Sequence, residues 1–515
     1  MTLRDSLDYT PNDLKFGTSG LRGLLSDMTD LECYINTAGF IKFLSDTGEQ
    51  FETIYIAGDL RSSTPRIMQV VAQAIADNGL MVINCGLIPT PALAYYAFLK
   101  QQPCIMVTGS HIPDDRNGIK FYKTSGEVLK EDEQAIQQAV ATVRAEIYAG
   151  DTERFQTDGS LTEIAELPPL DSSAEETYVL RHTDFFEQDC LKGMNLVMYQ
   201  HSSVSRDLLP KILRLLGADV VEAARSEKFI PIDTENIRPV DEVLFRELAN
   251  EYSGTFAIVS TDGDGDRPFV IDERGTFHRG DILGLVVSEY LGSEAVAFPV
   301  SCNDAVTEYL NQKKVRFVYT KIGSPYVVSA MDRLKNEYTN VAGWEVNGGF
   351  LIGEDCAVDG RILKALPTRD AVVPIICALL DAKAKNLKLS ELFGRLPRRF
   401  TQAGLIDNFP VEISARMIEL LAKDDAYARS MIASAFSAER GFGHEVASIN
   451  ALDGIRITFV NGDIAHLRPS GNAPQLRIYS NADSQDRADQ IVALAIEEPH
   501  GVFRKLETLL DNLEF

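Results

Sequence analysis

The sequence predicts an α/β fold, with three similar mixed α/β domains followed by a smaller α+β C-terminal domain. Three observations lead to this prediction. Short apolar segments alternate with amphipathic helical ones, the alternation returns twice along the chain, and the pattern changes after about residue 396. Alternating strands and helices are typical of a largely parallel sheet that helices cover on both faces.

The first alternating region covers residues 54–107. Proline in a first helical turn favours a helix start, as in Thr64-Pro65 and Thr90-Pro91, and Asn78-Gly79 suits the end of the first helix. The expected elements are a strand at 55–59, a helix beginning at 64, a strand at 81–86, a helix beginning at 90 and a strand at 104–108.

The same alternation is expected at 195–260 and again at 296–345. After residue 396 the pattern becomes three alternating strands and a helix, which indicates an α+β domain. A polar segment at 150–177 contains Pro168-Pro169 and suits a domain boundary. The predicted domains are 1–165, 166–284, 285–396 and 397–515.

Composition excludes several classes of protein. The chain has 515 residues, of which 45% are hydrophobic, so a disordered or low-complexity chain is excluded. The 75 acidic residues outnumber the 50 basic ones and give a net charge of −25, which disfavours nucleic acid and anionic membranes as partners. Seven cysteines without a Cys-x-x-Cys pair indicate reduced thiols. With no signal peptide or membrane span evident in the sequence, we expect a cytoplasmic protein.

The loop at 108–122, TGSHIPDDRNGIKFY, follows an expected strand and contains candidate catalytic residues. Ligands of open α/β sheets bind at the carboxyl ends of strands. Ser110 could be a nucleophile there, with His111 and Lys120 as acid/base partners. The alternative is an ordinary turn, because Ser, Pro, Asp and Asn all favour turns. The Gly-x-Ser-x-Gly pattern of a serine hydrolase is absent.

The loop at 260–272, STDGDGDRPFVID, contains a candidate metal site. Asp262, Asp264 and Asp266 alternate, so their carboxylates can converge on one Mg²⁺ or Ca²⁺ ion. An EF-hand loop is one alternative, but it requires glycine at its sixth position, where this chain has Arg267. A solvated acidic turn without metal is the other.

Three further segments could bind a phosphorylated sugar. Glu345 and Asn347, in GWEVNGGF at 343–350, could hydrogen-bond to neighbouring hydroxyls. The segment HLRPSGNAPQLR at 466–477 combines two arginines, a serine and a glycine, as phosphate-binding loops do. Arg22, in KFGTSGLRG at 15–23, could approach a phosphate. For each segment the alternative is an ordinary turn or loop.

Five motifs in this order give the chain a resemblance to a known family over essentially its whole length. They are KFGTSGLRG, TGSHIPDDRNGIK, TDGDGDR, WEVNGG and RPSGNAPQLR. The chain resembles the α-D-phosphohexomutase family of the phosphomannomutase/phosphoglucomutase type. The resemblance implies four domains around a central cleft, each supplying one loop.

The resemblance also implies a role for each candidate residue. Ser110 would carry a phosphoryl group, and that phosphate would join the three aspartates as a ligand of Mg²⁺. Arg22 and Arg267 would lie near the phosphate, and His111 and Lys120 would be acid/base and positioning groups. Ser324, Glu345 and Asn347 would contact the sugar. The clamp for the second phosphate would be formed by Arg468, Ser470, Gly471, Asn472 and Arg477.

The chain departs from the common family pattern at four places. Glycine stands at 109 where alanine is frequent, and Ile112 follows where asparagine is frequent. Asn347 stands in place of serine, and Gly323-Ser324 in place of Gly-His. The last two changes fall on sugar-contacting positions.

The implied reaction is a reversible transfer of phosphate between O1 and O6 of a hexose, with hexose 1-phosphate and 6-phosphate as substrates. A hexose 1,6-bisphosphate would be both intermediate and activator. The motifs favour mannose phosphate, with glucose phosphate or both sugars as the alternative. A Mg²⁺-dependent sugar phosphatase, a non-catalytic sugar-phosphate-binding protein and a calcium-binding structural protein are the rival classes. The sequence does not predict an oligomeric state.

Overall fold

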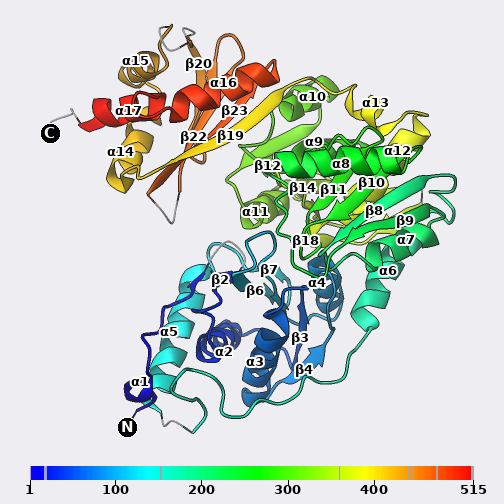
Figure 1. Ribbon diagram of the computed structural model, residues 1–515, viewed down its shortest axis with the longest axis vertical. Helices are drawn as coiled ribbons and strands as arrows, with labels where there is room; N and C mark the ends of the chain where they lie inside the picture. Colours follow the sequence, from blue (N-terminus) through cyan, green and yellow to red (C-terminus); the bar gives the residue numbers. More distant parts are fainter. Residues whose placement is uncertain are drawn as a thin grey trace. The chain divides into compact units, whose positions relative to one another are not determined.

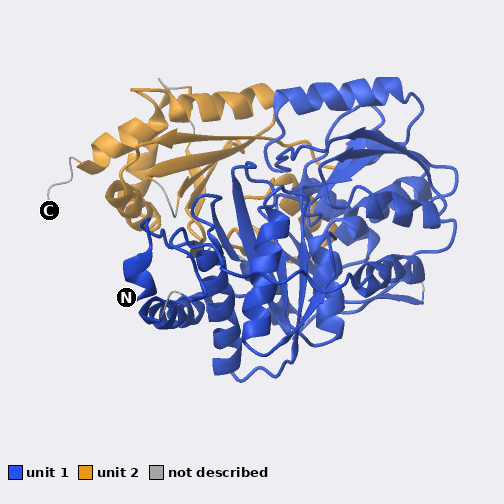
Figure 2. Ribbon diagram, turned by 60° about the horizontal axis from the view of Figure 1, so that its bottom comes forward, with its two compact units in different colours: residues 1–297, 323–393 blue, residues 298–322, 394–515 orange. Residues whose placement is uncertain are grey.

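The computed structural model describes residues 2–16, 20–150, 153–358, 360–438, 441–442, 445–470 and 474–511 (Figure 1). The chain divides into two compact units, which are treated separately below (Figure 2). Unit 1 comprises residues 1–297 and 323–393, and unit 2 comprises residues 298–322 and 394–515.

The first sheet of unit 1 has seven strands, in the order β1-β2-β6-β5-β3-β4, with β7 paired to β6. Strands β5, β3 and β4, at one end of this order, are parallel, whereas β2 and β6 are antiparallel to their neighbours. The strands are β1 Lys15–Phe16, β2 Gly20–Leu24, β3 Thr53–Gly58, β4 Met81–Asn84, β5 Cys104–Val107, β6 Arg116–Lys123 and β7 Gly126–Glu127. The helices of this region are α1 Leu3–Ser6, α2 Asp30–Asp46, α3 Thr64–Asp77, α4 Thr90–Leu99 and α5 Glu133–Ala149.

Helix α3 shows why this sequence folds as it does. Pro65 occupies its first turn, and Asn78 ends it before Gly79, whose φ of +77° suits glycine. Its buried residues, Ile67, Val70, Val71 and Ala74 among them, follow the i, i+3, i+4, i+7 spacing of one helical face. That face packs into the hydrophobic core of the first sheet.

The second sheet has the order β11-β10-β8-β9, with β10-β8 and β8-β9 parallel and β10-β11 antiparallel. Its elements are β8 Asn195–His201, α7 Leu208–Leu215, β9 Asp219–Arg225, α8 Pro239–Glu251, β10 Ala257–Thr261 and β11 Pro268–Asp272, preceded by α6 Ser173–Phe185. The turn between β10 and β11 contains the three aspartates of the predicted metal loop.

The third sheet of unit 1 pairs β12 with β14 in parallel, and β14, β15 and β18 in antiparallel order. Only residues 295–297 of β12 belong to this unit. The elements are α9 Gly280–Tyr290, β12 Ala295–Pro299, α11 Ser324–Leu334, β14 Val341–Trp344, β15 Phe350–Ile352, β18 Leu366–Asp370, α12 Val372–Ala384 and α13 Leu389–Phe393, with a small hairpin of β16 Cys356–Val358 and β17 Arg361–Leu363.

Unit 2 is built mainly on an antiparallel sheet in the order β19-β23-β22-β21-β20. Its own hydrophobic core lies between this sheet and the helices. The elements are α10 Ala305–Lys313, β13 Arg316–Thr320, β19 Phe400–Asp407, α14 Val411–Leu421, α15 Ala426–Ala435, β20 Val446–Asn450, β21 Ile455–Phe459, β22 Ile464–Pro469, β23 Gln475–Ala482, α16 Gln485–Ile496 and α17 Val502–Asp511.

The predicted α/β class is confirmed, and the predicted α+β character of the C-terminal region matches its antiparallel sheet and helices. The division into four domains remains a prediction. Among the described residues, no helix has the length and apolar character needed to cross a membrane.

Candidate active site

Ser110 lies just beyond β5, at the carboxyl edge of the parallel part of the first sheet. It is buried, and its φ of +54° places it in the left-handed region, which is uncommon for a residue other than glycine. The backbone N–H of Ser110 donates to Thr108 Oγ1 at 2.7 Å, and Thr108 Oγ1 donates to Asp59 Oδ2 at 2.7 Å. Residues at the ends of two neighbouring parallel strands therefore fix the serine in this conformation.

Arg61 holds the serine loop from inside. Its guanidinium is buried and donates hydrogen bonds to four backbone carbonyls of the loop, those of Ser110, Ile112, Pro113 and Arg116. Its Nε lies 3.3 Å from Asp59 Oδ2, and its Cζ lies 3.9 Å from the centroid of the Phe229 ring. A Cβ atom at position 109 would lie 2.7 Å from Arg61 Cζ, so glycine at this position makes room for the guanidinium.

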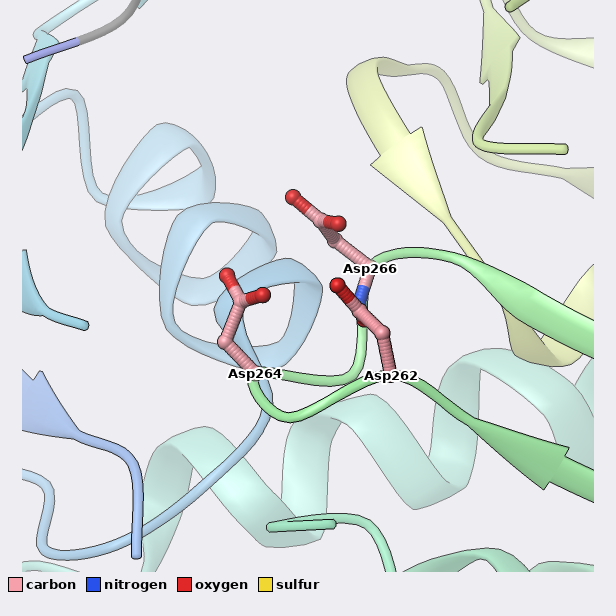
Figure 3. Close-up of side chains that lie close together, drawn as sticks. All are labelled: Asp262, Asp264 and Asp266. Carbon is pink, nitrogen blue, oxygen red and sulfur yellow. The ribbon is translucent and has the colours of Figure 1, made fainter. Parts of the chain in front are cut away.

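The three aspartates of the β10–β11 turn lie together and are buried (Figure 3). Each offers one carboxylate oxygen, and these oxygens lie within 4.8 Å of one another. Ser110 Oγ donates to Asp262 Oδ2 at 2.8 Å, so the predicted nucleophile and the predicted metal loop meet. The Oδ1 atoms of Asp264 and Asp266 are buried and accept no hydrogen bond from the described part of the chain.

The carboxyl groups of this cluster differ in the direction in which their pKa values are shifted. Burial and the neighbouring Asp264 and Asp266 raise the pKa of Asp262 well above its ordinary value. Burial opposes the ionisation of Asp264 too, but Lys120 outweighs it and lowers the pKa of Asp264. Lys120 Nζ donates to Asp264 Oδ2 at 2.6 Å and to Asp266 Oδ2 at 2.8 Å. Thus Lys120, as predicted from its loop, lies in the cluster.

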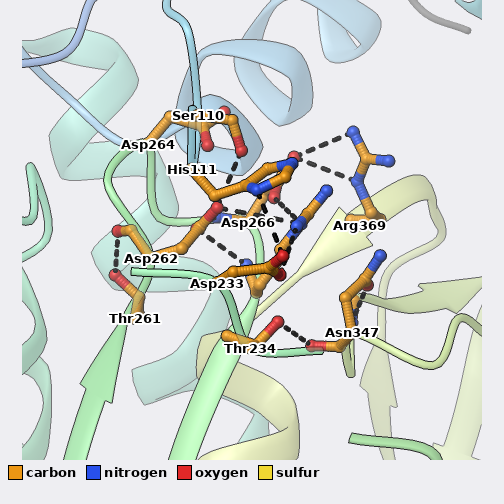
Figure 4. Close-up of polar contacts among 12 residues, drawn as sticks. Ser110, His111, Asp233, Thr234, Thr261, Asp262, Asp264, Asp266, Asn347 and Arg369 are labelled. Carbon is orange, nitrogen blue, oxygen red and sulfur yellow. Dashed lines mark hydrogen bonds and ion pairs between the residues drawn. The ribbon is translucent and has the colours of Figure 1, made fainter. Parts of the chain in front are cut away.

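His111 lies beside Ser110 and the aspartates (Figure 4), and Arg267 and Arg22 lie close enough to influence its pKa. Burial and the charges of Arg267 and Arg22 lower the pKa of His111 to about 2, so the ring is neutral at physiological pH. Arg267 Nε lies 3.8 Å from both Asp262 Oδ2 and Asp266 Oδ1. The side chain of Arg22, on β2, retains contact with solvent. Desolvation by the surrounding protein and the charges of Arg267 and Arg369 lower the pKa of Arg22 to about 10.

The predicted sugar loop is held by neighbouring segments of unit 1. Glu345 Oε2 accepts a hydrogen bond from Arg369 Nη1 at 3.0 Å. The side chain of Asn347 donates to Glu235 Oε1 at 3.2 Å and accepts from the backbone N–H of Gly349 at 3.0 Å. The backbone carbonyl of Asn347 accepts from Thr234 Oγ1 at 2.9 Å.

Ser324 begins α11 in the same unit and is fully buried. Its hydroxyl donates to Glu127 Oε2 of the first sheet. The structure therefore brings together, within unit 1, eleven predicted residues, namely Arg22, Ser110, His111, Lys120, Asp262, Asp264, Asp266, Arg267, Ser324, Glu345 and Asn347.

The predicted phosphate clamp lies in unit 2. Arg468 on β22 and Arg477 on β23 are direct partners across the two antiparallel strands, so their side chains project from the same face of the sheet. Like charges at such positions repel each other unless an anion or an acid compensates, and Asp453 Oδ1 lies 3.0 Å from Arg468 Nε. Ser470 follows β22, where its N–H donates to the Gln475 carbonyl. Gly471 and Asn472 lie outside the described residues.

Comparison with known proteins decides the family. Models of phosphoglucomutase/phosphomannomutase domain I, domain III and the C-terminal domain match residues 13–146, 279–400 and 421–498. A phosphomannomutase from Salmonella muenchen is 42% identical over 481 residues, which cover 93% of this chain and 94% of that protein. The chain belongs to the phosphoglucomutase/phosphomannomutase family. It is therefore a phosphohexomutase, and the resemblance drawn from its motifs is confirmed.

Other relatives of this phosphohexomutase agree. A phosphomannomutase from Sinorhizobium fredii is 38% identical, over 93% of this chain and 97% of that protein. A crystal structure described as a putative phosphomannomutase from Thermus thermophilus has a TM-score of 0.71 at 17% identity, covering 98% of this chain and 100% of that one. At this identity the crystal structure supports the fold alone.

Sequence reasoning missed four charged residues that the phosphohexomutase places in the site. Arg61 and Asp233 follow strands β3 and β9, so the rule that ligands bind beyond strand ends could have found them. Glu127 ends the two-residue strand β7, and Arg369 lies on β18 between Thr368 and Asp370, so their sequence neighbours give no signal of burial. Asp233 Oδ2 lies 3.5 Å from His111 Nδ1.

Proposed function

We propose that this phosphohexomutase interconverts mannose 1-phosphate and mannose 6-phosphate through a phosphorylated Ser110. The observation that supports this most directly is the 2.8 Å contact of Ser110 Oγ with Asp262 Oδ2, at the edge of three buried carboxylates. A nucleophilic hydroxyl beside a cluster of acids is an arrangement that serves phosphoryl transfer once a cation balances the charge.

Magnesium is the cation we assign to this cluster. Asp262, Asp264 and Asp266 would hold it, and the two Oδ1 atoms without hydrogen bonds, on Asp264 and Asp266, fit oxygen ligation of a hard cation. When bound, Mg²⁺ would neutralise charge on the phosphoryl oxygens during transfer.

The remaining roles belong to side chains of the protein. In the forward half-reaction the P–O bond to Ser110 Oγ breaks, and a new bond forms to the free O6 hydroxyl of mannose 1-phosphate, giving the 1,6-bisphosphate. The hydroxyl proton leaves as that bond forms, and we assign Lys120, in its neutral amine form, as its acceptor. Arg267, beside Asp262, places positive charge where the phosphoryl group would be.

In the second half-reaction the bisphosphate presents its other phosphate, and that phosphoryl group returns to Ser110. The bond between phosphorus and the sugar O1 breaks, the new bond forms at Ser110 Oγ, and the sugar O1 takes up the proton that Lys120 accepted in the first half-reaction. The product is mannose 6-phosphate. A trace of hexose 1,6-bisphosphate would act as activator because it phosphorylates Ser110. Glu345 and Asn347 are assigned to the sugar, and Arg468, Ser470, Gly471, Asn472 and Arg477 to phosphate binding.

The choice of mannose rests on relatives. The relatives at 42% and 38% identity, which cover most of this chain, are both named phosphomannomutase. A relative from Thermococcus kodakarensis at 26% identity is named phosphoglucomutase/phosphomannomutase, which makes glucose phosphate the alternative substrate.

The test is ³¹P NMR of the protein with Mg²⁺, a trace of hexose 1,6-bisphosphate, and mannose 1-phosphate and glucose 1-phosphate in competition. We expect the mannose 6-phosphate signal to grow first. Faster growth of glucose 6-phosphate would replace the substrate assignment, and release of inorganic phosphate without an isomer would support a phosphatase instead. Ser110→Ala should abolish turnover, whereas Ser125→Ala, an exposed serine of the same sheet region, should not.

A further inference from the structure

Arg369 links two loops of the site that sequence motifs describe separately. It lies on β18, and its side chain is only 8% exposed. Its Nε and Nη2 atoms both lie 3.0 Å from Asp266 Oδ2 (Figure 4). Its Nη1 lies 3.0 Å from Glu345 Oε2. One planar guanidinium thus pairs with an aspartate of the metal loop and with the glutamate of the sugar loop.

The glycine at 349 leaves space for this arginine. A Cβ atom at that position would lie 2.5 Å from Arg369 Cδ and 2.6 Å from its Cγ. A residue with a side chain at 349 and Arg369 in its present position are therefore sterically incompatible. The arginine and the glycine form a matched pair.

The strand that bears Arg369 is fixed on both sides. Thr368 Oγ1 donates to Glu127 Oε1 at 2.6 Å, and Ser324 Oγ donates to the other oxygen of the same buried carboxylate. On the other side, Asp370 Oδ1 accepts from the hydroxyl of Tyr178 at 2.7 Å. These anchors hold the backbone of Arg369, so its guanidinium has little freedom to leave the two carboxylates.

We propose that Arg369 is a positioning residue of the phosphohexomutase, which aligns Glu345 for the sugar and balances the charge of Asp266. The inference rests on the proposed function, since it assigns Glu345 to substrate and Asp266 to Mg²⁺. Arg369 engages Glu345 Oε2 and leaves Oε1 for a sugar hydroxyl. It engages Asp266 Oδ2 and leaves Oδ1, which is buried without a hydrogen bond, for the cation.

Two effects of opposite sign follow from removing the guanidinium. Without Arg369, Glu345 loses its alignment, and binding of mannose 1-phosphate should weaken about tenfold. Without the same positive charge, the aspartates attract Mg²⁺ more strongly, and its dissociation constant should fall about threefold or more. A general loosening of the fold would weaken both.

Arg369→Lys separates the two effects. Lysine restores a positive charge near Asp266 but lacks the planar fork that reaches both carboxylates. Mg²⁺ binding should therefore return toward that of the starting protein, while mannose 1-phosphate binding stays weak. Gly349→Ala should resemble Arg369→Ala, because the added Cβ displaces the arginine, and it should add little when Arg369 is already alanine.

The experiment is isothermal titration calorimetry with MgCl₂ and with mannose 1-phosphate, carried out in a Ser110→Ala background so that no turnover occurs. Arg333→Ala, an exposed arginine on α11, is the matched control and should change neither constant. Thermal unfolding of each variant reports whether it is folded. The same substitutions with Ser110 intact give kcat and KM, and we expect KM to rise in Arg369→Lys with a smaller change in kcat.

The opposite shifts of the two dissociation constants in Arg369→Ala, with Mg²⁺ affinity recovered in Arg369→Lys, would support the proposal. Equal weakening of both ligands in a folded variant, or no change in either, would overturn it. If the protein with Ser110 intact does not isomerise hexose phosphates, the proposed function fails. The two binding constants would still decide the role of Arg369.

Discussion

Replacing Arg61 should damage both the stability of unit 1 and the reactivity of Ser110. Arg61→Ala leaves four carbonyls of the serine loop without their guanidinium donor and leaves the buried Asp59 without its ion-pair partner. Breaking a buried ion pair by removing one partner costs about 3–5 kcal/mol. We expect a loss of unfolding free energy in that range, because the lost hydrogen bonds and the lost pair belong to the same group.

Arg61→Lys should cost less, about 1.5–3 kcal/mol, because the ammonium keeps a charge near Asp59 but cannot serve four carbonyls at once. The control is Arg154→Lys, whose side chain is 50% exposed and pairs with Asp77 at the surface of the same region. The assays are urea unfolding followed by circular dichroism, and the rate at which hexose 1,6-bisphosphate phosphorylates the protein. An Arg61→Ala protein within about 1 kcal/mol of the original, phosphorylated at the original rate, would refute this reasoning.

Three further predictions concern the metal loop, the serine loop and pH. Asp264→Asn should raise the Mg²⁺ dissociation constant at least about tenfold in calorimetry, since one charged ligand is lost; an unchanged constant would argue against the metal assignment. Gly109→Ala should slow phosphorylation of Ser110 and cost about 1–3 kcal/mol in urea unfolding, since the new Cβ meets Arg61 at 2.7 Å; wild-type values in both assays would show that the loop adjusts. Burial lowers the pKa of His466 to about 4, whereas the unfolded chain titrates near 6.5, so protons favour the unfolded state as pH falls from 6.5 toward 4. His466→Gln should therefore reduce the loss of unfolding free energy between pH 7 and pH 5 by about 2 kcal/mol, and an unchanged pH dependence would contradict this.

Local sequence patterns predicted the parallel strands and their helices well. Residues 104–108 were expected as a strand and form β5, and the helix expected to begin at 64 is α3. The antiparallel strands β6 and β15 were not predicted, because each follows a functional loop whose polar residues obscure its strand pattern. Because these strands run antiparallel to their neighbours, the sheets that contain them are mixed.

The sequence predicted those site residues that stand together in a single loop motif. Ser110 and the three aspartates each stand in a motif of adjacent residues, and the structure brings them within hydrogen-bond distance. Arg61 and Arg369 act across long sequence separations, on carbonyls more than 45 residues away and on a carboxylate 103 residues away. A position just beyond a strand can mark such an arginine as a candidate, as for Arg61, but only the fold identifies its partners.

The glycine at 109 illustrates the same limit in a single position. The sequence indicates only that it loosens the backbone beside Ser110. The structure adds that a side chain there would collide with the guanidinium of Arg61. The reason for the glycine lies in a residue 48 positions earlier in the chain.

The most direct test of the central claim is to locate the phosphoryl group. The protein is treated with hexose 1,6-bisphosphate and Mg²⁺, desalted, and analysed by intact mass and peptide mapping before and after a chase with mannose 1-phosphate. We predict one phosphoryl group per chain, on Ser110, which the chase transfers to the sugar. A protein that gains no phosphoryl group, gains it at another residue, or keeps it through the chase would contradict the phosphoserine mechanism.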